Sequence, residues 1–143
     1  MPKTEIKWQN EMRFEGIPES GHAVIMDAEK VHGGADTGAR PMELLLVGLG
    51  GCTGMDVVSI LKKMRKHIKS FRMNINAERA KEHPKVYTNI SLEYIVEGDM
   101  EEKDVMKAIE LSRQKFCSVS AMLGKTAKIS YTWKLLRTGD SVS

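Results

Sequence analysis

The sequence predicts an α+β fold in which antiparallel strands and two long helices form a single domain over residues 1–143. Apolar and polar residues alternate with a period of two in three segments, 71–77, 86–96 and 129–135, as expected for strands with one covered face. Helical spacing of apolar residues runs from Pro41 to about Lys66 and begins again after Asp99. Strands and helices therefore alternate along one chain that is large enough to bury a core.

The first third of the chain predicts short strands followed by a loop. Alternation over 6–14 predicts an opening strand or hairpin, and a second short strand over 22–27 follows a turn at 17–21. Three glycines in the segment 33–38 predict a loop. We expect an ordered core over about 6–136 and a frayed tail over 137–143.

The first long helix is predicted to start at Pro41, a residue suited to the first turn. Its first half is apolar nearly all round, which predicts a central, buried helix. Four glycines interrupt it, at a combined cost of roughly 3–4 kcal/mol relative to alanine. We expect close approach of a second helix to offset that cost, with Cys52 at the contact. The glycines are Gly48, Gly50, Gly51 and Gly54.

The second long helix follows a polar connection over 78–85. Asp99 is a plausible N-cap, and Glu102 three residues later completes a capping-box pattern. A short helix from Cys117 is predicted to end at Gly124 in the left-handed conformation. The inner face of the second long helix is predicted to carry Val105, Ala108, Ile109 and Ser112.

The composition indicates which partners and which cellular compartment to expect. The net charge is only +3, and its surplus over 62–69 lies near a helix end, where cations complement the helix dipole, so we expect no nucleic-acid partner. The N-terminal residues lack an apolar signal-peptide core, and we expect no stretch to reach the length needed to span a bilayer, which places the chain in the cytoplasm. Because thiols are kept reduced there, a disulfide should be transient and functional.

The two cysteines, Cys52 and Cys117, stand 65 residues apart with no CxxC motif. A pair that only folding brings together suggests thiol redox chemistry, with one cysteine attacking and the other resolving. The alternative is two buried small hydrophobic residues. Asp56, four residues after Cys52, disfavours the nearby thiolate, so an activating cation has to come from elsewhere. Arg40 and Arg13 are candidates for it, or else are ordinary surface charges.

Other kinds of site find little support in the sequence. The four histidines show no ligand spacing, so we expect no metal and no cofactor. A Cys–His hydrolase using His22 or His32 stays an alternative, since chain order does not exclude it. The glycine loop at 33–38 lacks the lysine and the strand–helix setting of a phosphate-binding loop.

Taken together, these segments resemble the OsmC/Ohr family of osmotically induced and organic-hydroperoxide-resistance proteins, and more narrowly its YhfA-like branch. The resemblance covers roughly residues 6–136 in order. The motifs that carry it are Ser20-Gly21-His22, Arg40-Pro41-Met42-Glu43-Leu44, Gly50-Gly51-Cys52, Asp56-Val57-Val58-Ser59-Ile60-Leu61 and Lys115-Phe116-Cys117-Ser118-Val119.

This resemblance implies an OsmC-like fold, with sheets wrapped around two long central helices in an intertwined homodimer. It also implies a peroxidase reaction on small organic hydroperoxides. Cys52 would become a sulfenic acid, Cys117 would resolve it as a disulfide, and a dithiol such as a lipoylated protein would reduce that disulfide. The rival interpretation is a non-catalytic dimeric module that binds a small molecule and retains residual cysteines.

One position departs from the family pattern. Peroxidase members place an acid directly after the proline, where it orients an arginine over the thiol, but Met42 stands there in this chain. Glu43, one residue later, is turned about 100° around the helix and should point away from the place of that acid. Arg40 stands at the family's asparagine position. Arg40 and Glu43 are the candidates to support Cys52, and we expect a less activated thiol than in those peroxidases.

Overall fold

The computed structural model describes residues 2–137, which form two compact units that divide between Val47 and Gly48. Helix α1 (Pro41–Lys63) begins in the first unit and continues into the second. The expected frayed tail lies outside the described residues beyond Arg137, and the expectation of a single domain stays a prediction.

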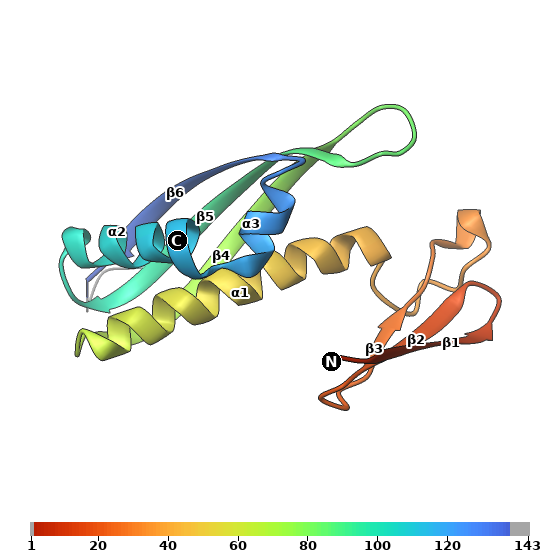
Figure 1. Cartoon of the computed structure of the whole chain (residues 1–143), viewed down its shortest axis with the longest axis horizontal. Helices are drawn as coiled ribbons and strands as arrows, with labels where there is room; N and C mark the ends of the chain where they lie inside the picture. Colours follow the sequence, from red (N-terminus) through yellow and green to blue (C-terminus); the bar gives the residue numbers. More distant parts are fainter. Residues whose placement is uncertain (1, 138–143) are drawn as a thin grey trace. The chain divides into compact units, whose positions relative to one another are not determined.

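The first unit contains a three-stranded antiparallel sheet in the order β1-β2-β3 (Figure 1). Its strands are β1 (Thr4–Asn10), β2 (Arg13–Pro18) and β3 (Val24–Met26), which confirms the predicted hairpin and the short strand after it. A 3-10 turn, η1 (Lys30–His32), follows β3 and leads into the glycine loop at 33–38.

Asp27 organises that loop from the end of β3. Its carboxylate accepts hydrogen bonds from the Thr37 hydroxyl at 2.6 Å and from the backbone N–H groups of Thr37, Ala28 and Ala35. These donors favour the charged form and hold the pKa of Asp27 down at about 2, with the Thr37 hydroxyl making the largest contribution.

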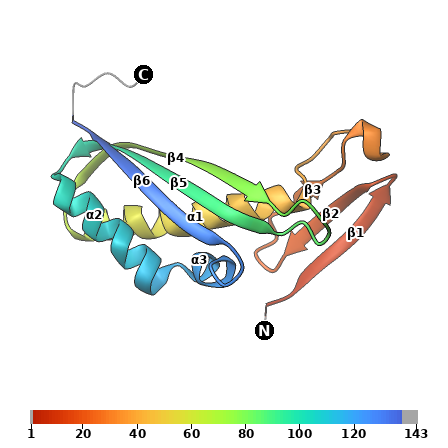
Figure 2. The ribbon, with the colours of Figure 1, turned by 90° about the horizontal axis from the view of Figure 1, so that it is seen from above.

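The second unit is built on a sheet with the order β4-β5-β6 (Figure 2). Strand β4 (His67–Arg79) pairs antiparallel with β5 (Tyr87–Asp99), as predicted. Strand β6 (Lys128–Leu136) pairs parallel with β5, so the prediction of wholly antiparallel sheets was wrong for this pair. A connection that contains helices returns the chain to the same end of the sheet, which allows parallel pairing.

Three helical segments make that connection: α2 (Glu102–Leu111), the π-helical segment η2 (Ser112–Phe116) and α3 (Ser118–Leu123). Together with the part of α1 that lies in this unit, they cover one face of the sheet (Figures 1 and 2). The core between helices and sheet includes Leu49, Val57, Leu61, Ile90, Leu92, Tyr94, Val96, Val105, Ala108 and Ile109.

Two helix ends differ from the prediction. Helix α2 is capped by Glu101, whose N–H donates to the Asp104 carboxylate at 2.9 Å, and not by the predicted pair Asp99 and Glu102. The box is shifted by two residues because β5 runs on as far as Asp99. Gly124 ends α3 in the right-handed conformation, where a Cβ would lie 2.8 Å from the Ser120 carbonyl oxygen. Close approach, and not a left-handed turn, favours glycine there.

Two glycines of α1 pack against strand β4, where the sequence predicted a second helix. A Cβ at Gly50 would lie 2.9 Å from Cδ1 of Ile75 on β4, and one at Gly54 would lie 3.6 Å from Phe71. Gly48 and Gly51 have nothing within 4 Å of such a Cβ among the described residues. Among residues 2–137, none of these glycines therefore faces a second helix, and one glycine face of α1 stays open.

Helix α1 is also long and apolar enough to cross a bilayer, so the expectation that no segment has that length was wrong. The test considers length and composition alone, and the core helix of a soluble protein passes it too. Only 22% of its most apolar window is buried inside the chain. Much of this apolar helix thus lacks a cover in a single copy.

Candidate functional site

The fold brings the two cysteines together. The sulfur atoms of Cys52 and Cys117 and a carboxylate oxygen of Asp56 all lie within 4.8 Å of one another. Both cysteines are free thiols, Cys52 half-buried and Cys117 only 3% exposed. The structure therefore places a dithiol beside a carboxylate, with Cys52 the more accessible sulfur.

The positions of these side chains follow from local structure. Cys52 and Asp56 are four residues apart on α1, so they share one face of the helix. Cys117 is the extended residue between η2 and α3, and its N–H donates to the Ser112 carbonyl at 2.7 Å. Its sulfur accepts a hydrogen bond from the Ser120 N–H at 3.4 Å and so caps α3. That cap fixes the Cys117 sulfur at the start of the helix.

A chain of buried hydroxyl groups holds the Asp56 carboxylate. The Ser112 hydroxyl donates to Asp56 Oδ2 at 2.9 Å, and Thr53 Oγ1 lies 2.8 Å from both the Ser112 and the Tyr94 hydroxyl oxygens. A hydroxyl has a single proton, so Thr53 must donate to Ser112, and Tyr94 must donate to Thr53. Burial is the main reason that the pKa of Tyr94 is raised, which keeps its proton in place.

The environment of Cys117 favours its neutral thiol. Burial raises the pKa of Cys117, and the adjacent Cys52 thiol raises it further. The hydrogen bonds from Ser120 work in the opposite direction, but burial makes the largest contribution. A buried, protonated thiol is suited to resolving an oxidised sulfur beside it and not to making the first attack on a substrate.

The structure gives the other predicted site residues partners in the first unit. The Arg40 guanidinium binds the Asp36 carboxylate at 2.7 Å and donates to the Gly38 carbonyl, and the hydrogen bond to Asp36 raises the pKa of Arg40. The Glu43 carboxylate accepts from the Arg40 N–H at 2.8 Å, at the start of α1. Both side chains thus have local roles.

Arg13, the other candidate cation, donates to Gln9 and Thr37, both at 2.7 Å. His22 and His32 lie in the first unit and Cys52 lies in the second, so the Cys–His hydrolase alternative stays a prediction.

The sequence prediction missed Thr53, Tyr94 and Ser120, and treated Ser112 only as a residue on an inner helix face. A usable signal was present for Thr53 and Ser112, which are small polar residues at helix positions that the sequence predicts to be covered. The structure leaves them 1% and 0% exposed, and buried polar groups are normally hydrogen-bonded. Tyr94 looked like an ordinary core aromatic in an alternating strand.

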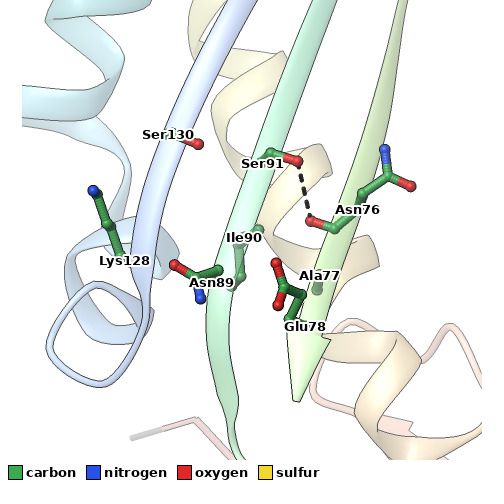
Figure 3. A pocket seen from close by; sticks show the side chains of 8 residues that line it. All are labelled: Asn76, Ala77, Glu78, Asn89, Ile90, Ser91, Lys128 and Ser130. Atoms are coloured by element: carbon green, nitrogen blue, oxygen red, sulfur yellow. Dashed lines mark hydrogen bonds between the residues drawn. The ribbon is translucent and has the colours of Figure 1, made fainter. Parts of the chain in front are cut away.

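A depression of about 320 Å³ lies at one end of the β4-β5-β6 sheet (Figure 3). Small polar side chains line much of it, and the Ser91 hydroxyl donates to the Asn76 carbonyl within it. It contains no thiol, because its side chains come mainly from the sheet positions that alternate with the core. We therefore place the candidate chemistry at the cysteines. The lining residues are Asn76, Ala77, Glu78, Asn89, Ile90, Ser91, Lys128 and Ser130.

Comparison with known proteins gives a consistent result. The sequence model of the OsmC-like protein family matches residues 33–132, a range that includes both cysteines. Protein YhfA of Escherichia coli K12 is 36% identical over 135 residues, which cover 94% of this chain and 98% of YhfA. The crystal structure of a hypothetical protein from Aquifex aeolicus has 35% identity and a TM-score of 0.80, covering 94% and 97% of the two chains.

The fold also extends to much more distant sequences. The crystal structure of an organic hydroperoxide resistance protein OsmC from Legionella pneumophila has a TM-score of 0.69 at 10% identity, covering 92% of this chain and 96% of that one. At that identity the likeness concerns the fold alone.

Proposed function

The chain belongs to the OsmC-like protein family, and we propose that it is a thiol-dependent peroxidase that reduces small organic hydroperoxides in defence against oxidative stress. The observation that carries this proposal is the approach of the Cys52 and Cys117 sulfurs to within 4.8 Å in the reduced chain. A sulfenic acid formed on one sulfur would have a resolving thiol beside it.

The proposed reaction has three steps. The Cys52 thiolate attacks an oxygen of the hydroperoxide, the O–O bond breaks, and the alkoxide leaves and takes up a proton to become the alcohol. The Cys117 thiol then attacks the sulfur of the Cys52 sulfenic acid, forming the disulfide and releasing water. A dithiol reductant, such as a lipoylated protein, exchanges with that disulfide and restores both thiols.

Burial supports this assignment of roles. A hydroperoxide has easier access to the half-buried Cys52 than to Cys117, which is 3% exposed. Because its pKa is raised, Cys117 is mostly protonated near neutral pH and is a weak first nucleophile. Once Cys52 is oxidised, however, Cys117 needs only a short movement to reach it.

The second candidate function is a non-catalytic module that binds a small molecule. Two observations favour it: the Arg40 guanidinium is engaged by Asp36, and the carboxylate beside the sulfurs belongs to Asp56. Arg40 and Glu43 would then support the start of α1 and contribute little to thiol chemistry. The departure at Met42 fits this picture, and Met42→Glu tests whether an acid there raises peroxide turnover.

Reaction with hydroperoxides distinguishes the peroxidase from the binding module. Stoichiometric cumene hydroperoxide should produce a Cys52–Cys117 disulfide in the wild type and a dimedone-reactive sulfenic acid at Cys52 in Cys117→Ser, both identified by mass spectrometry. Turnover of cumene, tert-butyl and hydrogen peroxide with dihydrolipoamide or thioredoxin then identifies the substrate and reductant. Absence of both adducts would leave the binding module as the function, and labelling of Cys117 in preference to Cys52 would reverse the roles.

We also infer that the protein acts as a homodimer in the cytoplasm. The OsmC/Ohr family is typically dimeric, and α1 leaves Gly48 and Gly51 open and Met55 76% exposed. A second copy on this face would cover the apolar helix, in an interface of the large class, well over about 2,000 Å². Sedimentation should show a dimer at micromolar concentration, and Gly51→Leu should disrupt it or yield insoluble protein. A wild-type monomer would contradict this inference.

A further inference from the structure

The cluster at the cysteines has the composition of a metal site as well as of a redox pair. It offers two sulfur donors and one carboxylate oxygen, all within 4.8 Å of one another. We infer that the reduced chain binds a thiophilic divalent cation of the Zn²⁺ class through Cys52, Asp56 and Cys117. This inference goes beyond the proposed peroxidase function and does not depend on it, because it concerns the dithiol before any oxidation.

The distances are close to those that zinc requires. With Zn–S bonds near 2.3 Å, two sulfurs of a tetrahedral site are about 3.8 Å apart, and Zn–O bonds of about 2.0–2.2 Å place a sulfur and an oxygen slightly closer together. The observed limit of 4.8 Å exceeds these values by about 1 Å. A difference of about 1 Å is within the reach of side-chain rotations of Cys52 and Asp56 on α1.

Two of the three donors are already oriented by neighbouring groups. Asp56 Oδ2 accepts from the Ser112 hydroxyl at 2.9 Å, which leaves its other oxygen for an ion. The Cys117 sulfur is held by the Ser120 N–H at 3.4 Å. Hydrogen bonds of this kind fix the direction of metal ligands and strengthen their binding.

The local charge also favours a cation. Asp56 takes part in no ion pair among residues 2–137, although it lies beside two ionisable thiols. The guanidinium of Arg113, on the neighbouring η2, is occupied by the Ile129 carbonyl and the ring of Tyr131. Two thiolates and a carboxylate carry three negative charges, which a divalent ion would largely neutralise.

The donor set predicts which ion is preferred and what remains open. Thiolates favour Zn²⁺ and similar soft ions over Mg²⁺ and Ca²⁺, which require oxygen ligands. Three protein ligands leave a fourth tetrahedral position, which water or an added thiol can occupy. A bound ion would hold both sulfurs, so it should also block the disulfide between Cys52 and Cys117.

Cobalt provides the direct test. Co²⁺ added to the reduced full-length protein, kept reduced with a phosphine that does not bind the ion, should give near-ultraviolet thiolate-to-cobalt absorption at one ion per chain. Zn²⁺ should abolish that absorption by displacement, and Mg²⁺ should not. Cys52→Ser and Cys117→Ser should each lose it, and the disulfide form should show none.

Asp56→Asn is the decisive variant, because asparagine can still accept the Ser112 hydrogen bond but loses the anionic ligand. It should weaken Co²⁺ binding at least about tenfold, with an unchanged circular dichroism spectrum. Glu82→Gln, which removes one exposed charge from the β4–β5 connection, is the matched control and should bind as the wild type does. Absent thiolate absorption in the reduced wild type, or unweakened binding in Asp56→Asn, would overturn the three-ligand site.

Discussion

The charge of Asp56 makes a quantitative prediction about the reactivity of Cys52. Replacing Asp56 with asparagine removes a negative charge that lies within 4.8 Å of the Cys52 sulfur. The Ser112 hydrogen bond can be kept, because the asparagine oxygen still accepts it. We therefore expect Asp56→Asn to remove a repulsion that opposes negative charge on the Cys52 sulfur, and so to speed the alkylation of Cys52.

The size of the effect follows from Coulomb's law. Two unit charges 4.8 Å apart interact by about 0.9 kcal/mol at the dielectric constant of water and by about 3.5 kcal/mol at an effective value of 20. Because both groups are half-buried, the repulsion between them is about 1–2 kcal/mol. A more stable thiolate is also a weaker nucleophile, so the rate should rise about two- to sevenfold.

The assay is iodoacetamide alkylation at pH 7 in the Cys117→Ser background, where Cys52 is the single thiol, with a chelator present. Glu82→Gln removes an equal charge outside the cluster and should leave the rate unchanged. Added salt should reduce the difference between the wild type and Asp56→Asn only in part, since partly buried charges are screened less. An unchanged rate would refute the repulsion, and a slower one would show that Asp56 assists the thiol as a proton acceptor.

Four further outcomes are expected. Burial raises the pKa of Cys117, so closure of the disulfide from the Cys52 sulfenic acid should accelerate as pH rises through that raised pKa, which stopped-flow mass spectrometry can follow. The same raised pKa means that the Cys117 contribution to stability is present at low pH and lost at alkaline pH, so chemical denaturation of reduced wild type should show a steeper alkaline loss than Cys117→Ala. Arg40→Ala should slow Cys52 alkylation by less than about twofold, because Asp36 already engages the guanidinium; a tenfold loss would show that Arg40 activates the thiol. Asp27, with its pKa lowered to about 2, should contribute stability above pH 4 that is lost as pH falls toward 2; Asp27→Asn should be less stable at pH 7 but lose less on acidification, as measured by thermal melting.

Local patterns predicted the parts of the fold that depend on neighbours in sequence. The period-two segments became β4, β5 and β6, and the helical spacing placed Val105, Ala108 and Ile109 in the core. The direction of β6 was not accessible in this way, because alternation is the same in parallel and antiparallel pairs. It depends on the path of the helical connection across the sheet.

The candidate site shows the same division. Both cysteines could be singled out from the sequence because thiols can undergo redox chemistry. The distance between them, however, depends on η2, an irregular segment that no helical periodicity predicts. Asp56 was expected to act on Cys52 alone, since only the folded chain brings Cys117 to the same carboxylate. The engagement of Arg40 by Asp36 depends on a loop conformation that sequence spacing does not specify.

The parallel pairing of β5 and β6 has a consequence for how oxidation changes the molecule. Cys117 lies on the crossover that joins these two strands, and Cys52 lies on a helix that precedes both. A bond between them would close a loop of 65 residues that contains β4, β5 and α2. Loss of entropy from the unfolded chain would then stabilise the oxidised form by up to about 4 kcal/mol. The melting temperature of the protein would therefore report its oxidation state. In each turnover the chain would alternate between a more stable disulfide form and a less stable reduced form.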